Sequence, residues 1–162
     1  MSVLPYISFA TFIAYILWIC VAFGVPESIS ETYYILERRR KGRGLIFTIW
    51  CWIVALLLLP YWLEISSENT QFLAFFAALG LCFVGAAPRF RSYGMERTTH
   101  FIGAVMSGAC SLMLLLWAGA GIYPLATLSA FAIPIFINRE NWLFWLEMGA
   151  FTPVFLAAFI NN

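Results

Sequence analysis

Uncharged, mainly apolar stretches alternate with short polar connections along the whole chain. A helix needs about 20 predominantly apolar residues to cross a bilayer, and six stretches are near that length. They lie at about residues 4–25, 45–63, 72–88, 101–121, 123–137 and 142–160. This pattern predicts an all-α fold, a polytopic membrane helix bundle with six transmembrane helices that forms one domain over residues 1–162.

The fifth stretch is the shortest of the six, and it contains Pro124 and Pro134 near its ends. Membrane helices tolerate proline because neighbouring groups can satisfy the freed backbone. We therefore expect residues 123–137 to form a tilted or kinked crossing helix, or a re-entrant segment.

Composition strengthens the membrane interpretation. Of the 162 residues, 63% are hydrophobic and only 10% are charged, and a soluble domain of this size could not bury that much apolar surface. No basic residue precedes the stretch 4–25 and no small-residue cleavage site follows it, so we interpret it as a retained span. No disulfide is expected, because all four cysteines fall within predicted spans: Cys20, Cys51, Cys82 and Cys110.

The basic residues are confined to alternate connections. All nine Lys and Arg residues follow the first, third and fifth stretches. Because positively charged loops stay in the cytoplasm, these connections are predicted to be cytoplasmic, with both termini on the non-cytoplasmic side of a cytoplasmic (inner) or plasma membrane. A net charge of +1 without a basic face argues against nucleic-acid binding.

The first connection, PESISETYYILERRRKGRG (26–44), is the most polar part of the chain. Ser28 and Glu31 have the spacing of a capping box, and apolar residues at helical intervals follow. An interfacial amphipathic helix over 28–41 is therefore predicted. The basic run at its end is expected to contact anionic inner-leaflet lipids; it comprises Arg38, Arg39, Arg40, Lys41 and Arg43.

Small residues predict how the stretches pack, because helices in lipid approach closely where side chains are small. Such residues recur every four positions in 72–88 and 101–121, which are expected to form the bundle centre; they are Ala74, Ala78, Cys82, Ala86, Gly103, Ser107 and Ser111. The aromatic and leucine-rich faces of 45–63 and 142–160 are then expected to face lipid. Tryptophans near span ends, including Trp50 and Trp62, are expected at the membrane interface.

Glu147 carries the main candidate chemistry. It lies five residues beyond Trp142, about 7 Å along a helix, and so inside the apolar layer. A carboxylate there is costly and usually faces a partner or a watery cavity. It is expected to carry a proton or to meet a cation, and His100 and Arg89 lie at a similar depth. Glu147 is then either a functional contact or one half of a static pair.

The predicted ligand-binding residues converge on the cytoplasmic half of the bundle; they are Glu147, His100, Arg89, Ser28, Ser30 and Glu31. Serine, histidine and glutamate are also the members of a hydrolase triad, but a triad is defined by geometry, and no catalytic residue is assigned. No metal site is predicted, because one histidine with scattered glutamates lacks the usual three or four ligands, and no cofactor is predicted.

Three segments, "PESISETYY", "LGLCFVGAAPRF" and "THFIGAVMSGACSL", resemble the six-span membrane proteins related to the damage-regulated autophagy modulator and their uncharacterised bacterial relatives. The matching positions are Pro26, Ser28, Ser30, Gly80, Gly85, Pro88, His100 and Gly103. The resemblance implies a compact six-helix bundle with a role in membrane lipid organisation or regulation, and it supplies no catalytic residues.

The chain departs from that group in two respects. Glu31 is followed by Thr and Tyr where the group has Asp and Gly. The arginine-rich first connection is predicted to be cytoplasmic, whereas animal relatives are thought to place theirs on the opposite side.

The leading hypothesis is a non-enzymatic membrane protein that binds or moves a lipid headgroup or small polar solute through a polar pocket in the cytoplasmic half. The alternatives are an oligomeric channel or pore formed by several copies of the chain, an intramembrane lipid-modifying enzyme that uses Ser28 or Ser30 with His100, and an anchor or subunit for another protein.

Overall fold

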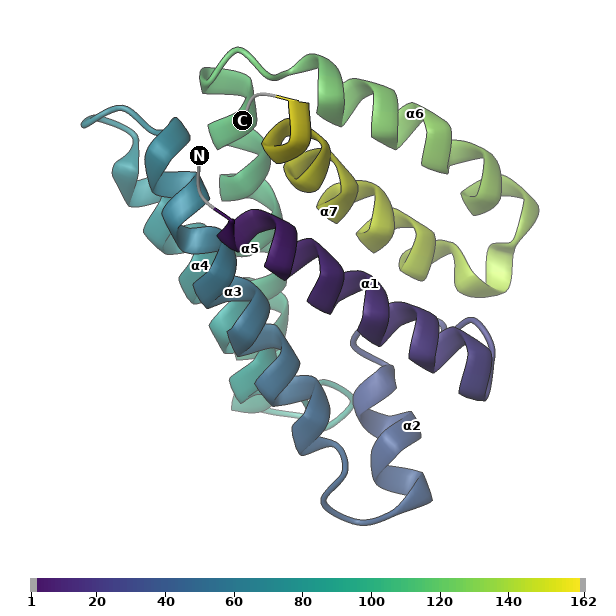
Figure 1. Cartoon of the computed structure of the whole chain (residues 1–162). Helices are drawn as coiled ribbons and strands as arrows, with labels where there is room; N and C mark the ends of the chain where they lie inside the picture. The colour runs from purple at the N-terminus through teal and green to yellow at the C-terminus, as the bar shows by residue number, and fades with distance from the viewer. Residues whose placement is uncertain (1–2, 161–162) are drawn as a thin grey trace.

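The computed structural model describes residues 3–160, which form an all-α structure (Figure 1). Within this range there are seven α-helices and one short 3-10 helix. They are α1 (Leu4–Phe23), α2 (Thr32–Arg39), α3 (Leu45–Ile65), α4 (Gln71–Ala86), α5 (Met95–Trp117), α6 (Ile122–Ile137), η1 (Arg139–Asn141) and α7 (Trp142–Ile160).

Four helical segments are long and apolar enough to cross a membrane: α1, α3, α5 and the continuous segment Arg139–Ile160 that contains η1 and α7. Helices α4 and α6 are also apolar, but each has only 16 residues. These helices support an integral membrane protein built as a helical bundle.

Most helix bounds follow the apolar stretches, and α7 coincides with the predicted 142–160. Two helices differ in their bounds from the predicted segments. Helix α5 begins at Met95, six residues before the predicted 101, because its first turn includes the polar side chains Glu96 and Arg97. The surface helix predicted over 28–41 is confined to α2, Thr32–Arg39, and residues 28–31 form turns instead.

Helices α4 and α5 approach closely through glycine. Gly103 belongs to the small-residue row predicted for 101–121, whereas Gly80 lies outside the row predicted for 72–88. A Cβ atom built at Gly80 would lie 2.5 Å from the carbonyl oxygen of Gly103, and one at Gly103 would lie 2.6 Å from that of Gly80. Ser107 and Ser111 are buried on the same face of α5. Any side chain at these two glycines would therefore separate the helices.

Helix α3 is the central helix of the bundle, a position expected for 72–88 and 101–121. One face of α3, with Leu45, Ile49 and Trp52, is exposed, as the predicted lipid-facing side of 45–63 requires. Half of its most apolar stretch is buried, the largest share among the four long segments. Helix α3 packs against α1, α2, α4 and α5, whereas α6 packs mainly on α7 (Figure 1). The tryptophans Trp50 and Trp62 of α3 are buried and not interfacial.

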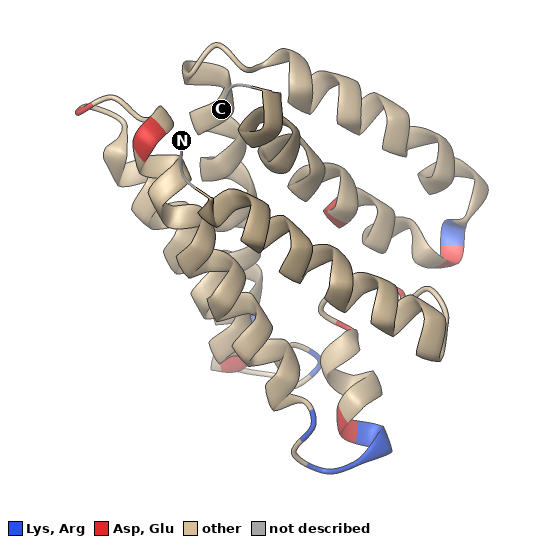
Figure 2. Ribbon diagram, in the orientation of Figure 1, with Lys and Arg blue, Asp and Glu red and all other residues tan. Residues whose placement is uncertain are grey.

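The basic residues lie in three connections at one end of the bundle, away from the two termini (Figure 2). We call this the basic end; it comprises residues 24–44, 87–97 and 138–141. The opposite end carries the loops 66–70 and 118–121. This arrangement follows from the alternating direction of the six apolar helices.

Candidate functional site

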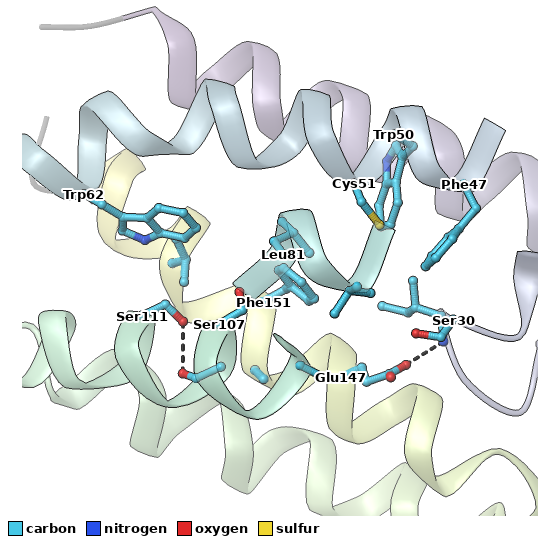
Figure 3. Close-up of a pocket in the computed structure, with 16 residues that line it drawn as sticks. Ser30, Phe47, Trp50, Cys51, Trp62, Leu81, Ser107, Ser111, Glu147 and Phe151 are labelled. Atoms are coloured by element: carbon cyan, nitrogen blue, oxygen red, sulfur yellow. Dashed lines mark hydrogen bonds between the residues drawn. The ribbon is translucent and has the colours of Figure 1, made fainter. Parts of the chain in front are cut away.

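A cavity of about 100 Å³ lies between α3, α4, α5 and α7, and its lining extends from Ser30 at the basic end to Trp62 near the other end of α3 (Figure 3). Its wall is mainly apolar, with Phe47, Trp50 and Leu81 among the side chains that line it. Ala104 of α5 also lines the cavity and is exposed.

The segment 24–31 closes the cavity at the basic end, where Ile29 and Ser30 form part of its wall. This segment is tied to the junction before α7. The side-chain amide of Asn141 donates to the carbonyl oxygens of Val25 and Pro26, at 2.8 and 2.9 Å. The backbone amide of Phe144 donates to the carbonyl oxygen of Glu27, at 3.0 Å.

The same segment is tied to the α4–α5 connection. The guanidinium of Arg91 lies 3.0 Å from Glu27 Oε2 and 2.9 Å from Glu31 Oε2, and the amide of Arg91 donates to the hydroxyl of Tyr34. Residues 24–31 therefore link the first connection of the basic end to the other two.

Glu147 projects from α7 into the cavity, as expected for a carboxylate in an apolar layer, but its partner differs from both predicted candidates (Figure 3). Its Oε2 accepts a hydrogen bond from the backbone amide of Ile29. Its Oε1 has no hydrogen-bond partner within residues 3–160. No Lys, Arg or His among the described residues lines the cavity, and neither His100 nor Arg89 bonds to this carboxylate.

His100 instead pairs with Ser30. Nε2 of the ring lies 3.0 Å from Ser30 Oγ, and Nδ1 lies 2.9 Å from the carbonyl oxygen of Ala87. Both side chains are buried: Ser30 is 7% exposed and His100 is 3% exposed. The pair connects the segment 24–31 to the start of α5, and Ser30 presents this contact at the wall of the cavity.

The remaining predicted site residues lie outside the cavity. Ser28 Oγ accepts the amide N–H of Glu31 at 3.1 Å, which is one half of the predicted capping box. The Glu31 carboxylate turns instead to Arg38 and Arg91, each at 2.9 Å. Arg89 is 62% exposed and pairs with Glu96.

Burial raises the pKa of the Glu31 carboxyl above its ordinary value, because the side chain is only 6% exposed. The guanidinium groups of Arg91 and Arg38 act in the opposite direction and lower the pKa in part. Desolvation is the larger of these effects, so Glu31 is a buried carboxylate whose charge depends on its two arginines.

The basic run is exposed at the basic end, and its five members are Arg38, Arg39, Arg40, Lys41 and Arg43. Its loop is ordered by Glu37, whose carboxylate accepts hydrogen bonds from the amides of Gly42 and Gly44 at 2.9 to 3.0 Å. These bonds lower the pKa of Glu37. The exposed arginines therefore lie beside an ordered loop, and their contact with anionic lipid stays a prediction.

The far end of the cavity contains polar groups that the sequence analysis did not assign to a site. The side chain of Trp62 is 1% exposed, and its indole Nε1 has no hydrogen-bond partner within the described residues. Ser107 and Ser111 line the cavity near it (Figure 3). In the sequence, Ser107 and Ser111 stand out as small residues at four-residue spacing, and that spacing predicts helix packing and not a site.

Comparisons with protein-family models, with curated proteins and with solved structures find no match to this chain. The resemblance to the six-span proteins related to the damage-regulated autophagy modulator therefore stays a prediction.

Proposed function

We propose that this protein binds a small amphipathic molecule in the cavity, with an ammonium or hydroxyl group of that molecule at Glu147. The observation that carries this proposal is the carboxylate itself: one oxygen is held by the Ile29 amide and the other has no partner among residues 3–160. A carboxylate can only accept hydrogen bonds, so it selects a donor and disfavours an anion.

The size and lining of the cavity narrow the ligand class. A cavity of roughly 150 Å³ holds benzene, which has six non-hydrogen atoms, so a cavity of about 100 Å³ limits an enclosed ligand to at most about six non-hydrogen atoms. A complete phospholipid headgroup is larger, and its phosphate would meet Glu147 without a compensating cation. The geometry thus favours the small polar solute over the lipid headgroup, with an apolar chain against Phe47 and Leu81.

We infer that the bundle crosses the membrane six times, with the basic end in the cytoplasm and both termini on the other side. The confinement of all nine basic residues to alternate connections supports this orientation, and the exposed basic run is suited to anionic lipid. A cysteine introduced at Arg40 should resist a membrane-impermeant maleimide applied from outside, whereas one at Glu68 should react. The reverse pattern would invert the orientation.

Binding can be measured with three probes of equal length: pentylammonium, pentanol and pentanoate. The protein is placed in lipid nanodiscs, and tryptophan fluorescence reports occupancy because Trp50 and Trp62 line the cavity. We expect pentylammonium to bind more tightly than pentanol, and pentanoate to bind most weakly. Empty nanodiscs correct for partition of each probe into lipid.

Glu147→Gln is the decisive variant, because glutamine keeps the size and the acceptor for Ile29 but loses the charge. Pentylammonium affinity should fall at least about tenfold, or about 1.4 kcal/mol, while the melting temperature changes little. Glu140→Gln, at an exposed residue of η1, is the matched control. Equal affinities for Glu147→Gln and wild type would remove Glu147 from ligand binding, and equal losses of affinity and stability would make it a structural contact.

A further inference from the structure

We propose that Ser30 is a nucleophile that takes an acyl group from a short-chain carboxylic ester, with His100 as its general base. This goes beyond ligand binding at Glu147 and rests on different atoms. Ser30 Oγ lies at the cavity wall and 3.0 Å from His100 Nε2. A serine hydroxyl within hydrogen-bond reach of a histidine is the arrangement that activates a weak nucleophile.

The orientation of the histidine ring fixes the direction of proton transfer. The carbonyl oxygen of Ala87 can only accept, so Nδ1 of His100 carries the hydrogen in that 2.9 Å bond. In the neutral ring Nε2 is then the acceptor, and it faces the Ser30 hydroxyl. Ala87 thus has the orienting role that a third group performs in other nucleophile–base pairs.

The surrounding structure holds this ring in place. Phe90 stacks on His100 with ring centroids 4.8 Å apart. His100 is in α5 and Ala87 directly follows α4, and these two helices are in close contact at Gly80 and Gly103. The distance between the ring and its orienting carbonyl is therefore set by the tightest helix pair of the bundle.

One backbone donor is available for the oxyanion that forms when an ester carbonyl is attacked. The amide of Ile29 is used by Glu147 and that of Glu31 by Ser28. The amide of Ser30 between them has no hydrogen-bond partner within residues 3–160. We assign the stabilisation of the oxyanion to this amide, which is the donor among the amides of residues 29–31 that has no other partner in the described range.

The proposed reaction has two balanced steps. Ser30 Oγ bonds to the carbonyl carbon, its proton passes to His100 Nε2, and the ester C–O bond breaks as His100 returns that proton to the departing alcohol. Water then attacks acyl-Ser30 with His100 again as base, which releases the carboxylic acid and restores the hydroxyl. The acyl chain lies against apolar cavity side chains such as Phe47 and Val84, and the cavity volume of about 100 Å³ limits it to about four carbons.

A fluorophosphonate with a short alkyl chain tests the nucleophile directly. In this reaction the Ser30 O–P bond forms, the P–F bond breaks and fluoride leaves. Wild-type protein in nanodiscs is labelled, digested and sequenced by mass spectrometry. We expect Ser30 to be labelled at least tenfold more than Ser28 and Ser129. Ser28 is also buried but bonds to an amide, and Ser129 is exposed.

His100→Gln should lower the labelling rate by roughly 10²-fold or more, in the range of general-base catalysis, and Ser129→Ala should leave it unchanged. No adduct on Ser30 in folded wild-type protein would overturn the proposal, as would undiminished labelling of folded His100→Gln. The comparison among serines of the wild type needs no variant to fold. The labelling uses no amine ligand, so this proposal and the binding proposal can fail separately.

Discussion

The two ends of the bundle are built differently. At the basic end, residues 24–31 bond to residues far along the chain, as in the contacts of Ile29 with Glu147 and of Ser30 with His100. At the opposite end, the hydrogen bonds of loops 66–70 and 118–121 join residues at most five positions apart, as between Ala120 and Leu115. Each opposite-end loop is thus a local turn, whereas the basic end is tertiary structure.

This difference teaches where to look for function. Reversing the direction of two helices needs only a short turn, as the opposite end demonstrates. The basic end contains more polar groups than that task requires. Its Ser30 lies at the wall of an apolar cavity, and its Ile29 holds Glu147 of α7 there. Polar groups beside an apolar cavity are expensive to bury, which supports the proposed site at this end of the cavity.

The largest expected effect comes from removing Arg91, which pairs with both Glu27 and Glu31. Arg91→Met leaves the buried carboxylate of Glu31 with Arg38 alone, and an unfolding free-energy loss of about 2–4 kcal/mol is expected. Unfolding in mixed micelles measures it. Arg139→Met, at an exposed residue, should cost less than about 0.5 kcal/mol. Similar losses for the two variants would mean that residues 24–31 do not hold the basic end together.

A smaller effect is expected from Asn141, whose amide joins η1 to Val25 and Pro26. Asn141→Ala removes two hydrogen bonds and should cost about 1–2 kcal/mol, with faster amide hydrogen exchange across residues 24–31. Ser67→Ala at the opposite end removes a local contact with Thr70. Ser67→Ala should lower the unfolding free energy by less than Asn141→Ala does, and it should speed amide hydrogen exchange only within loop 66–70. Exchange confined to η1 in Asn141→Ala would contradict the proposed coupling.

The sequence predicted the helices well because they depend on local hydrophobic runs. Span 142–160 coincides with α7, and the small residues of 101–121 correctly indicated the face of α5 that meets α4. The predicted helix over 28–41 was longer than α2, because the capping-box pattern considers only neighbouring residues and not the contacts of Glu31 with distant ones. In the fold Glu31 is drawn away to Arg91, and residues 28–31 form turns.

The site was only partly predictable. Glu147, Ser30 and His100 could be chosen by residue type, since each is unusual near the apolar layer. Their partners could not be chosen, because Glu147 bonds to an amide 118 positions away in the chain and backbone amides leave no mark in the sequence. Trp62 was misread as interfacial because an indole near a span end normally faces headgroups, whereas here it lines the cavity.

The smallest effect, and the one that best separates the two ends, is the pH dependence that Glu31 gives to stability. Burial raises the pKa of Glu31 in the folded protein above its ordinary value of 4.5. The folded state therefore binds this proton more tightly than the unfolded state. Its contribution is fully present below pH 4.5 and is lost as pH rises through the folded pKa.

Glu31→Gln should remove this contribution, so the difference in unfolding free energy between wild type and variant should change steadily as pH rises above 4.5. Arg91→Met sharpens the test, because the guanidinium of Arg91 lowers the pKa of Glu31. Without it the change should extend to higher pH. If the difference in unfolding free energy between wild type and Glu31→Gln stays constant from pH 4 to 8, the Glu31 carboxyl has the same pKa in the folded and unfolded states. Its burial would then have no electrostatic effect on stability.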